Sequence, residues 1–155
     1  MTPTERPSRR VAILAVLAAA CWGCGGGGDG FEHYAVNGTI RHDGDPLKSG
    51  TITFVPGGPG AAGTAEIVDG AFAIDAADGL SPGEYRVEIY SIQPTGRKIE
   101  NADDPGAKVD ETVNRVDRSF NVDSTLKVTV PPGGFPGPLA FDVTSPNPAA
   151  KKKRR

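Results

Sequence analysis

Residues 34–56 read YAVNGTIRHDGDPLKSGTITFVP, and this stretch decides the predicted fold. Apolar and polar residues alternate on both sides of residues 42–46, around Ile40 and again around Phe54, as they do in strands with one buried face. The HDGDP segment between the two runs has the chemistry of a turn, because Asp and Gly tolerate left-handed backbone and Pro fixes φ. The stretch therefore predicts a hairpin that opens an all-β domain.

Five more alternating runs follow along the chain, at residues 64–67, 71–74, 84–89, 125–130 and 139–144. Asp69-Gly70 separates the first two, and two such runs around Asp-Gly are a strong hairpin signal. In the third, Tyr85, Val87 and Ile89 are expected to point inward. Seven short strands without a convincing helix predict an antiparallel seven-stranded β-sandwich, in which two sheets bury their apolar faces against each other.

Residues 93–122 interrupt this pattern. They are charged and show no sustained alternation, so the sequence predicts a long connection without regular structure. Long connections in compact domains are commonly functional, and we expect any binding specificity to lie here.

The N-terminus has the parts of a secretory signal peptide. Three arginines precede the apolar run of residues 11–20, which would rise about 15 Å as a helix, half of the roughly 30 Å hydrocarbon core. The LAAAC segment that ends in Cys21 resembles a bacterial lipobox, in which the cysteine is lipidated and becomes the mature N-terminus. Cys24 is the alternative, because Gly23 also suits the cleavage position, but Trp22 does not suit the positions before it. An ordinary signal peptide with incidental cysteines is the remaining interpretation.

These features divide the chain into four parts. Residues 1–20 are the predicted signal peptide, and residues 21–30 are a lipidated cysteine with a glycine-rich tether. Residues 31–146 form the β-domain, and residues 147–155 form a disordered basic tail ending in KKKRR, which could contact anionic lipids or other polyanions. The expected location is the bacterial cell envelope, with the lipid in a membrane and the domain outside the cytoplasm.

The formal charge of −2 conceals an asymmetry. Without the first 20 and last five residues, nine basic residues face 18 acidic ones, a net charge near −9, which argues against a nucleic-acid partner for the domain. Both cysteines precede the domain, so neither a disulfide framework nor a thiolate metal site is expected within it.

The stretch at 34–56 also carries a family resemblance, through VNGTI, DG, PL and GTITFVP. DGAF at 69–72, PGEYRV at 82–87, STLKVTV at 124–130 and FDV at 141–143 extend it. Together they resemble the carboxypeptidase regulatory-like domain of bacterial lipoproteins. This resemblance implies a prealbumin-like (transthyretin-like) sandwich and names no ligand, because function lies in sites built on a fold. Between residues 113 and 121 only Phe120-Asn121 keeps the pattern common in such lipoproteins.

No catalytic, metal or cofactor site is predicted. GLSPG at 79–83 matches GxSxG, but Pro82 has no amide for an oxyanion hole and a strand follows it. The two histidines, His33 and His42, cannot supply a zinc ligand set, and each is expected at the surface. Asn37 begins a glycosylation sequon in form only. Five acidic residues without calcium-loop spacing are assigned to turns and loops: Asp43, Asp45, Asp69, Asp103 and Asp104.

The predicted function is therefore that of a lipid-anchored, extracytoplasmic β-sandwich module with a structural or protein-interaction role and no enzyme activity. The alternative is an accessory module that binds a glycan or small molecule. The membrane is contacted through the N-terminal lipid, while the protein or glycan partner and the ligand-binding residues are not identified by the sequence.

Overall fold

A computed structural model describes residues 30–146. The predicted signal peptide, both candidate lipidation cysteines, most of the tether and the basic tail lie outside the described residues. The strands are β1 (Val36–His42), β2 (Asp45–Pro46), β3 (Ser49–Pro56), β4 (Gly63–Val68), β5 (Ala71–Ile74), β6 (Gly83–Tyr90), β7 (Ile92–Glu100), β8 (Lys108–Asn114), β9 (Lys127–Val130) and β10 (Leu139–Val143). Two short 3-10 turns, η1 (Ala76–Asp78) and η2 (Arg118–Phe120), complete the elements, so this part of the chain is all-β, as predicted.

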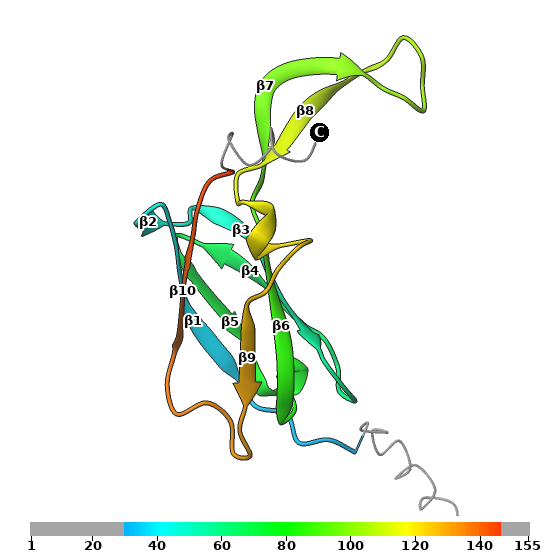
Figure 1. The fold of residues 1–155 in the computed structure, drawn as a ribbon. Helices are drawn as coiled ribbons and strands as arrows, with labels where there is room; N and C mark the ends of the chain where they lie inside the picture. The colour runs from blue at the N-terminus through cyan, green and yellow to red at the C-terminus, as the bar shows by residue number, and fades with distance from the viewer. Residues whose placement is uncertain (1–29, 147–155) are drawn as a thin grey trace, which may run out of the picture. The chain divides into compact units, whose positions relative to one another are not determined.

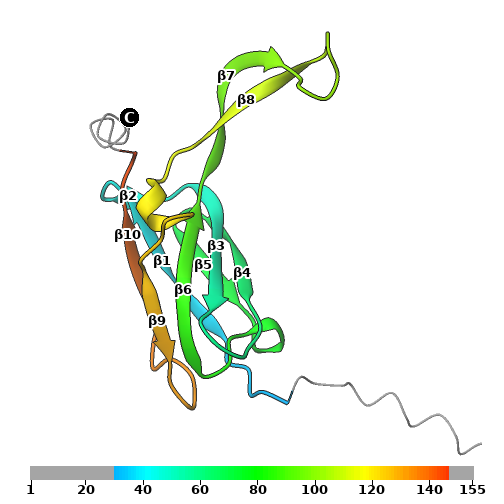
Figure 2. The same cartoon turned by 45° about the vertical axis from the view of Figure 1, so that its right-hand side comes forward.

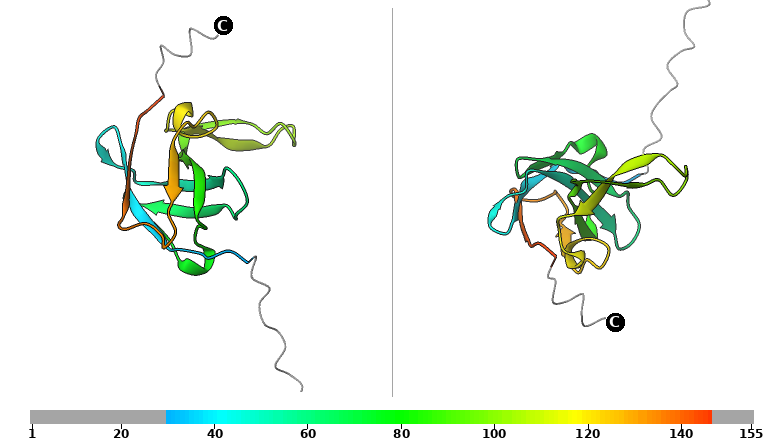
Figure 3. Two further views of the ribbon diagram at one scale, coloured as in Figure 1. Left: turned by 60° about the horizontal axis from the view of Figure 1, so that its bottom comes forward. Right: turned by 90° about the horizontal axis from the view of Figure 1, so that it is seen from above.

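The strands form two sheets (Figures 1 and 2). The main sheet has the order β10-β1-β5-β4-β3-β6-β9, with β2 added beside the end of β1, and β7 and β8 pair with each other. Neighbours are antiparallel except β1 and β10, which run parallel with Gly38 beside Leu139. The antiparallel prediction is therefore wrong for that pair. Seen from the ends, the main sheet curls into an open half-barrel (Figure 3).

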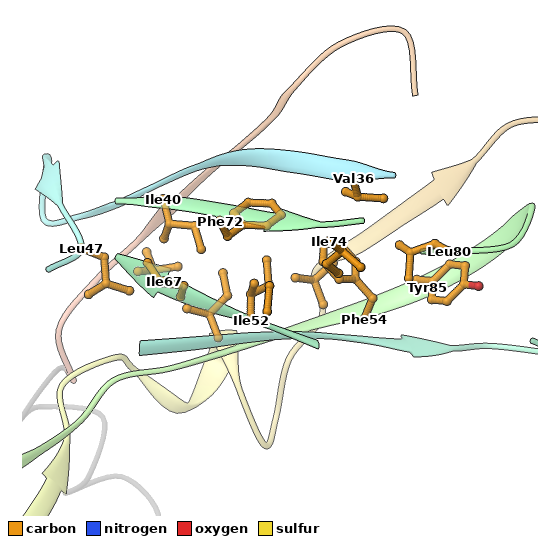
Figure 4. Packing of buried hydrophobic residues seen from close by; sticks show 14 of the residues in the cluster. Val36, Ile40, Leu47, Ile52, Phe54, Ile67, Phe72, Ile74, Leu80 and Tyr85 are labelled. Atoms are coloured by element: carbon orange, nitrogen blue, oxygen red, sulfur yellow. The ribbon is translucent and has the colours of Figure 1, made fainter. Parts of the chain in front are cut away.

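The core fills the inside of this curl. Figure 4 shows apolar side chains from β1, β3, β4, β5 and β6 meeting in one interior. Tyr85, Val87 and Ile89 are all buried, which confirms the inward face predicted for β6. The edge strands β9 and β10 are less deeply buried than the central strands. Each has one buried residue, Val130 in β9 and Val143 in β10, whereas Val128 and Phe141 are only partly buried.

The predicted opening hairpin is wrong, since β1 and β3 are not neighbours. The HDGDP turn does form, with Asp43 and Gly44 at φ +53° and +95°, but it returns the chain only as far as the two-residue β2. The rest of that edge of β1 pairs with β5, and the other edge pairs with β10. Strand β3 therefore lies elsewhere in the sheet, between β4 and β6.

The second predicted turn is confirmed. Asp69 and Gly70, at φ +47° and +81°, join β4 to β5, with Val68 opposite Ala71. Both residues are left-handed, which is the backbone that two-residue hairpin turns require.

The prediction of an irregular connection at residues 93–122 is wrong, because most of β7, all of β8 and η2 lie within it. The side chains that link the two strands are charged, Arg97 with Glu111 and Lys98 with Asp110. The sequence of these strands therefore shows no sustained alternation of apolar and polar residues. The available signal was the turn chemistry of Asp104-Pro105-Gly106 between them, where Gly106 has φ +101°.

Candidate interaction surface

We call the β7–β8 sheet, residues 92–114, the arm. In Figures 1 and 2 it extends beyond the end of the main sheet. Its strands pair only with each other, from Ile92 opposite Asn114 to Glu100 opposite Lys108, with an irregularity in β7 between Pro94 and Lys98. Each strand therefore keeps one outer edge unpaired within the described part of the chain.

A hydrogen-bond network fixes the register of the arm at its centre. The Thr95 hydroxyl donates to Glu111 Oε2 at 2.5 Å, and Arg97 Nε donates to the same oxygen at 2.8 Å. The guanidinium NH2 group of Arg97 donates to Glu111 Oε1 at 3.0 Å. The Thr95 hydrogen bond first, and the Arg97 guanidinium next, hold the pKa of the Glu111 carboxyl below its usual value. The carboxylate thus ties β8 to β7 on one face.

The arm carries exposed aliphatic side chains. Of seven exposed large apolar residues in the described part of the chain, four lie on the arm: Ile92, Ile99, Val109 and Val113. Ile99 and Val109 are 48% and 41% exposed and stand opposite each other across the two strands. None of the four belongs to the core cluster, so this apolar surface is not used in folding the main sheet.

Buried Ser91 connects the arm to the main sheet. Its hydroxyl donates to the Ser49 carbonyl at 2.7 Å, and its amide donates to Asn114 Oδ1 at 3.0 Å. Its carbonyl accepts from the Arg115 amide at 2.9 Å. Both strands of the arm are therefore fastened at their base to the same point beside β3.

A clamp joins segments that lie far apart in the sequence. Ser145 donates its hydroxyl to Asp43 Oδ2 at 2.6 Å and its amide to Oδ1 at 3.2 Å, and these bonds hold the pKa of Asp43 below its usual value. His42 Nε2 lies 3.1 Å from the Arg115 carbonyl oxygen and 3.1 Å from Ser145 Oγ. Because the carbonyl only accepts and the hydroxyl hydrogen goes to Asp43, Nε2 is the donor in both contacts.

The clamp borders a surface groove of about 560 Å³ that reaches Lys48 and Gln93. Although the clamp contains Ser145, His42 and Asp43, its geometry differs from that of a hydrolytic triad. Asp43 bonds the serine hydroxyl directly and approaches the same imidazole nitrogen, Nε2, at 3.6 Å. In a triad the carboxylate binds the other ring nitrogen and leaves the hydroxyl to the imidazole. The arrangement supports a structural clamp.

The residues considered for chemistry are dispersed. Ser81 of the GxSxG match is buried, its amide donates to the Tyr85 hydroxyl at 3.1 Å, and strand β6 begins two residues later. His33 contacts the Gly79 carbonyl at 3.0 Å, whereas His42 belongs to the clamp. Among residues 30–146 no group of three or more His, Cys, Asp or Glu side chains is placed to hold a metal ion.

The acidic turn residues also lie apart. Asp43 bonds Ser145, whereas Asp69 pairs with Lys48 at 3.3 Å. Asp103 and Asp104 lie in the loop between β7 and β8, at the tip of the arm. No helix within the described residues is long and apolar enough to cross a membrane.

Comparison with protein-family models, with curated proteins and with solved structures finds no match for the chain. The resemblance to carboxypeptidase regulatory-like domains therefore stays a prediction from the sequence motifs. The arm, which sequence reasoning missed, is the surface with the largest share of exposed aliphatic side chains in the described part of the chain.

Proposed function

We propose that this protein is a non-catalytic interaction module of the bacterial cell envelope, anchored to a membrane by lipid on Cys21, with Cys24 as the alternative. The observation that supports a protein partner is the arm, an ordered two-stranded sheet whose Ile99 and Val109 side chains are exposed. Two-stranded hairpins alone are marginally stable in water, and exposed apolar surface commonly marks a binding site. A partner that covers the arm would add to the stability of the hairpin and would remove its apolar side chains from water.

The unpaired edge of β8 suggests how the partner binds. Its seven residues, Lys108–Asn114, contain no proline, and the extra residues of the irregularity lie in β7, which also contains Pro94. An edge with consecutive free amides and carbonyls can accept an added strand from another protein. We therefore infer that the partner presents an extended segment to β8 and apolar side chains to Ile99 and Val109.

A prealbumin-like sandwich is proposed for the domain as a whole. Its support is that all seven alternating runs of the sequence form strands, that Asp69-Gly70 forms the expected turn, and that β9 and β10 partly cover the core. An experimental structure in which residues 31–146 form two facing sheets of prealbumin topology would establish it, and a closed single barrel would refute it.

The arm proposal is tested by crosslinking in the cells that produce the protein. A photoreactive residue at Lys108 should yield a discrete protein adduct, and the Ile99→Ser/Val109→Ser double variant should lose it. The matched control is Lys98→Ser/Asp110→Ser, the neighbouring cross-strand pair, which forms an exposed ion pair at 3.1 Å and should keep the adduct. Equal behaviour of the two double variants, or no adduct at all, would contradict a partner on this surface.

The anchor is tested by metabolic labelling with a fatty acid and by detergent-phase partitioning. The wild type should incorporate label and enter the detergent phase, and the Cys21→Ala/Cys24→Ala variant should do neither. The two single variants identify which cysteine carries the lipid. Label that persists in the double variant would exclude the lipid anchor.

A further inference from the structure

The outer face of the main sheet is hollowed along β3. This hollow, which we call the β3 trough, has a volume of about 520 Å³ and is lined by Ser49, Gly50 and Thr51 of β3 with Glu66, Tyr90 and Ile92 on its flanks. Pockets for small ligands commonly have volumes of about 300–1,000 Å³. The trough lies on the sheet face and meets the arm only at Ile92, so it does not include the unpaired edge of β8.

The trough exists because small side chains of β3 lie between larger ones on both neighbouring strands. Thr51 pairs with Glu66 on β4 and with Tyr90 on β6, so these three side chains form one row across the sheet. In the next row Ser49 pairs with Val68, which is 58% exposed, and Ile92 beyond Tyr90 is 57% exposed. The floor is thus made of small hydroxyl side chains, and the walls are aromatic, aliphatic and acidic.

Tyr90 is held in place before any ligand arrives. Its hydroxyl donates to Glu88 Oε2 at 3.0 Å, and Glu88 in turn pairs with Arg86 at 2.6 Å. Burial, followed by the hydrogen bond to Glu88, raises the pKa of Tyr90, so the phenol is neutral. A ring fixed by its own hydroxyl loses little conformational freedom when a ligand packs against it.

The trough also offers polar groups with unused bonding capacity. Within residues 30–146, the hydroxyls of Ser49 and Thr51 and the carboxylate of Glu66 have no hydrogen-bond or ion-pair partner. The Thr64 hydroxyl is instead 3.2 Å from that of Thr53. Two hydroxyls and a carboxylate next to a fixed aromatic ring make a surface with both apolar and hydrogen-bonding contacts.

We propose that the β3 trough binds a saccharide, with the sugar ring packed against Tyr90 and its hydroxyls bonded to Glu66, Thr51 and Ser49. The charge of the lining favours this class of ligand. Glu66 is the one charged residue in it, so an anionic ligand finds no cation there. A single carboxylate is too few for calcium, which takes about six to eight oxygens. A neutral ligand with many hydroxyl groups satisfies the exposed donors and acceptors.

The test is isothermal titration calorimetry of the purified full-length protein in detergent with cellohexaose, maltohexaose and chitohexaose. At least one should bind. Tyr90→Ala should weaken that binding at least tenfold, and Tyr90→Phe, which keeps the ring but loses its hydrogen bond to Glu88, should weaken it less. Thr51→Val should weaken it about threefold to tenfold, which is the loss of one neutral hydrogen bond. Thr39→Val is the matched control, because Thr39 is an exposed threonine of β1 away from the trough.

The proposal is overturned if none of the three hexasaccharides binds, or if Thr39→Val weakens binding as much as Thr51→Val. It is also overturned if Tyr90→Ala folds and binds like the wild type. If Tyr90→Ala fails to fold, Thr51→Val and Glu66→Gln decide the outcome by the same comparison. The trough includes Ile92 at the base of the arm but neither Ile99 nor Val109, so Ile99→Ser/Val109→Ser should bind the saccharide unchanged.

Discussion

At the scale of single residues, Gly70 is where three segments of the main sheet meet. Its amide donates to the Leu47 carbonyl at 2.8 Å, and its carbonyl accepts from the Ile40 amide at 2.7 Å. Its φ is +81°, and an added Cβ would lie 2.8 Å from the Pro46 Cβ and 3.1 Å from the Ile40 oxygen. Glycine is therefore required here both by the left-handed backbone and by lack of space.

Gly44 separates these two requirements, because it has φ +95° but no atom within 4 Å of an added Cβ. Gly44→Ala should therefore lower the free energy of unfolding by about 1–2 kcal/mol, the cost of a left-handed residue with a side chain. Gly70→Ala should cost about 1–3 kcal/mol more, because the side chain is also overpacked. Urea denaturation of the two variants measures the difference, and an equal loss in both would contradict the packing argument.

At the scale of elements, the sequence predicted the strands that cover the core and missed those of the arm. Ile52 and Phe54 of β3 alternate with threonines because one face of the strand is buried, and periodicity reports burial. The arm buries no core, so its strands are held by Thr95, Arg97 and Glu111 and leave no periodic signal. The pairing of β1 with β5 and β10 could not be predicted either, because these two partners lie more than 30 and about 100 residues away along the chain.

The Glu111 network predicts that the arm loosens in acid. The pKa of Glu111 is depressed in the folded arm, so its stabilising contribution is present above the ordinary carboxyl pKa of about 4.3 and is lost as the pH falls through the lower, folded value. Amide hydrogen exchange, normalised to the intrinsic rate at each pH, should show loss of protection in β7 and β8 below about pH 4.3 while the main sheet keeps its own.

The same loosening should appear at neutral pH in Glu111→Gln, which keeps the shape of the side chain and removes its charge. Asp110→Asn is the matched control on the adjacent residue, because the side chains of its ion pair with Lys98 are 62% and 63% exposed and such pairs stabilise little. Loss of protection in both variants to the same extent would mean that the network is not what fixes the arm.

At the scale of the whole molecule, the core receives an irregular segment as well as strands. Residues 115–126 run from β8 to β9 and contribute buried Val116, with Phe120 and Leu126 packed against the core. The Ser124 hydroxyl donates to the Val87 carbonyl of β6 at 2.5 Å, which ties the segment to the main sheet. The motifs at 34–56 and 82–87 could not predict this, because a segment without period leaves only isolated residues such as Phe120-Asn121 to mark it.

Asn121 holds that segment together and so should control the stability of the whole domain. It is 2% exposed, its Nδ2 donates to the Val116 and Asp117 carbonyls at 3.2 and 2.8 Å, and its Oδ1 accepts from the Val122 amide at 2.8 Å. Asn121→Ala removes the side-chain partner of the buried contact to the Val116 carbonyl and of the Val122 amide, whereas the Asp117 carbonyl keeps the Phe120 amide at 3.0 Å. We expect a cost of about 1–3 kcal/mol in the free energy of unfolding.

Because Val116 belongs to the same core as the strands, we expect one cooperative urea transition at a lower midpoint, with no separate early phase. Asn101→Ala is the matched control, since Asn101 caps the loop at the tip of the arm through a 3.0 Å bond from the Asp103 amide and lies outside the core. Asn101→Ala should leave the free energy of unfolding within about 0.5 kcal/mol of the wild-type value. An Asn121→Ala transition that splits in two would show that residues 115–126 fold apart from the half-barrel they cover.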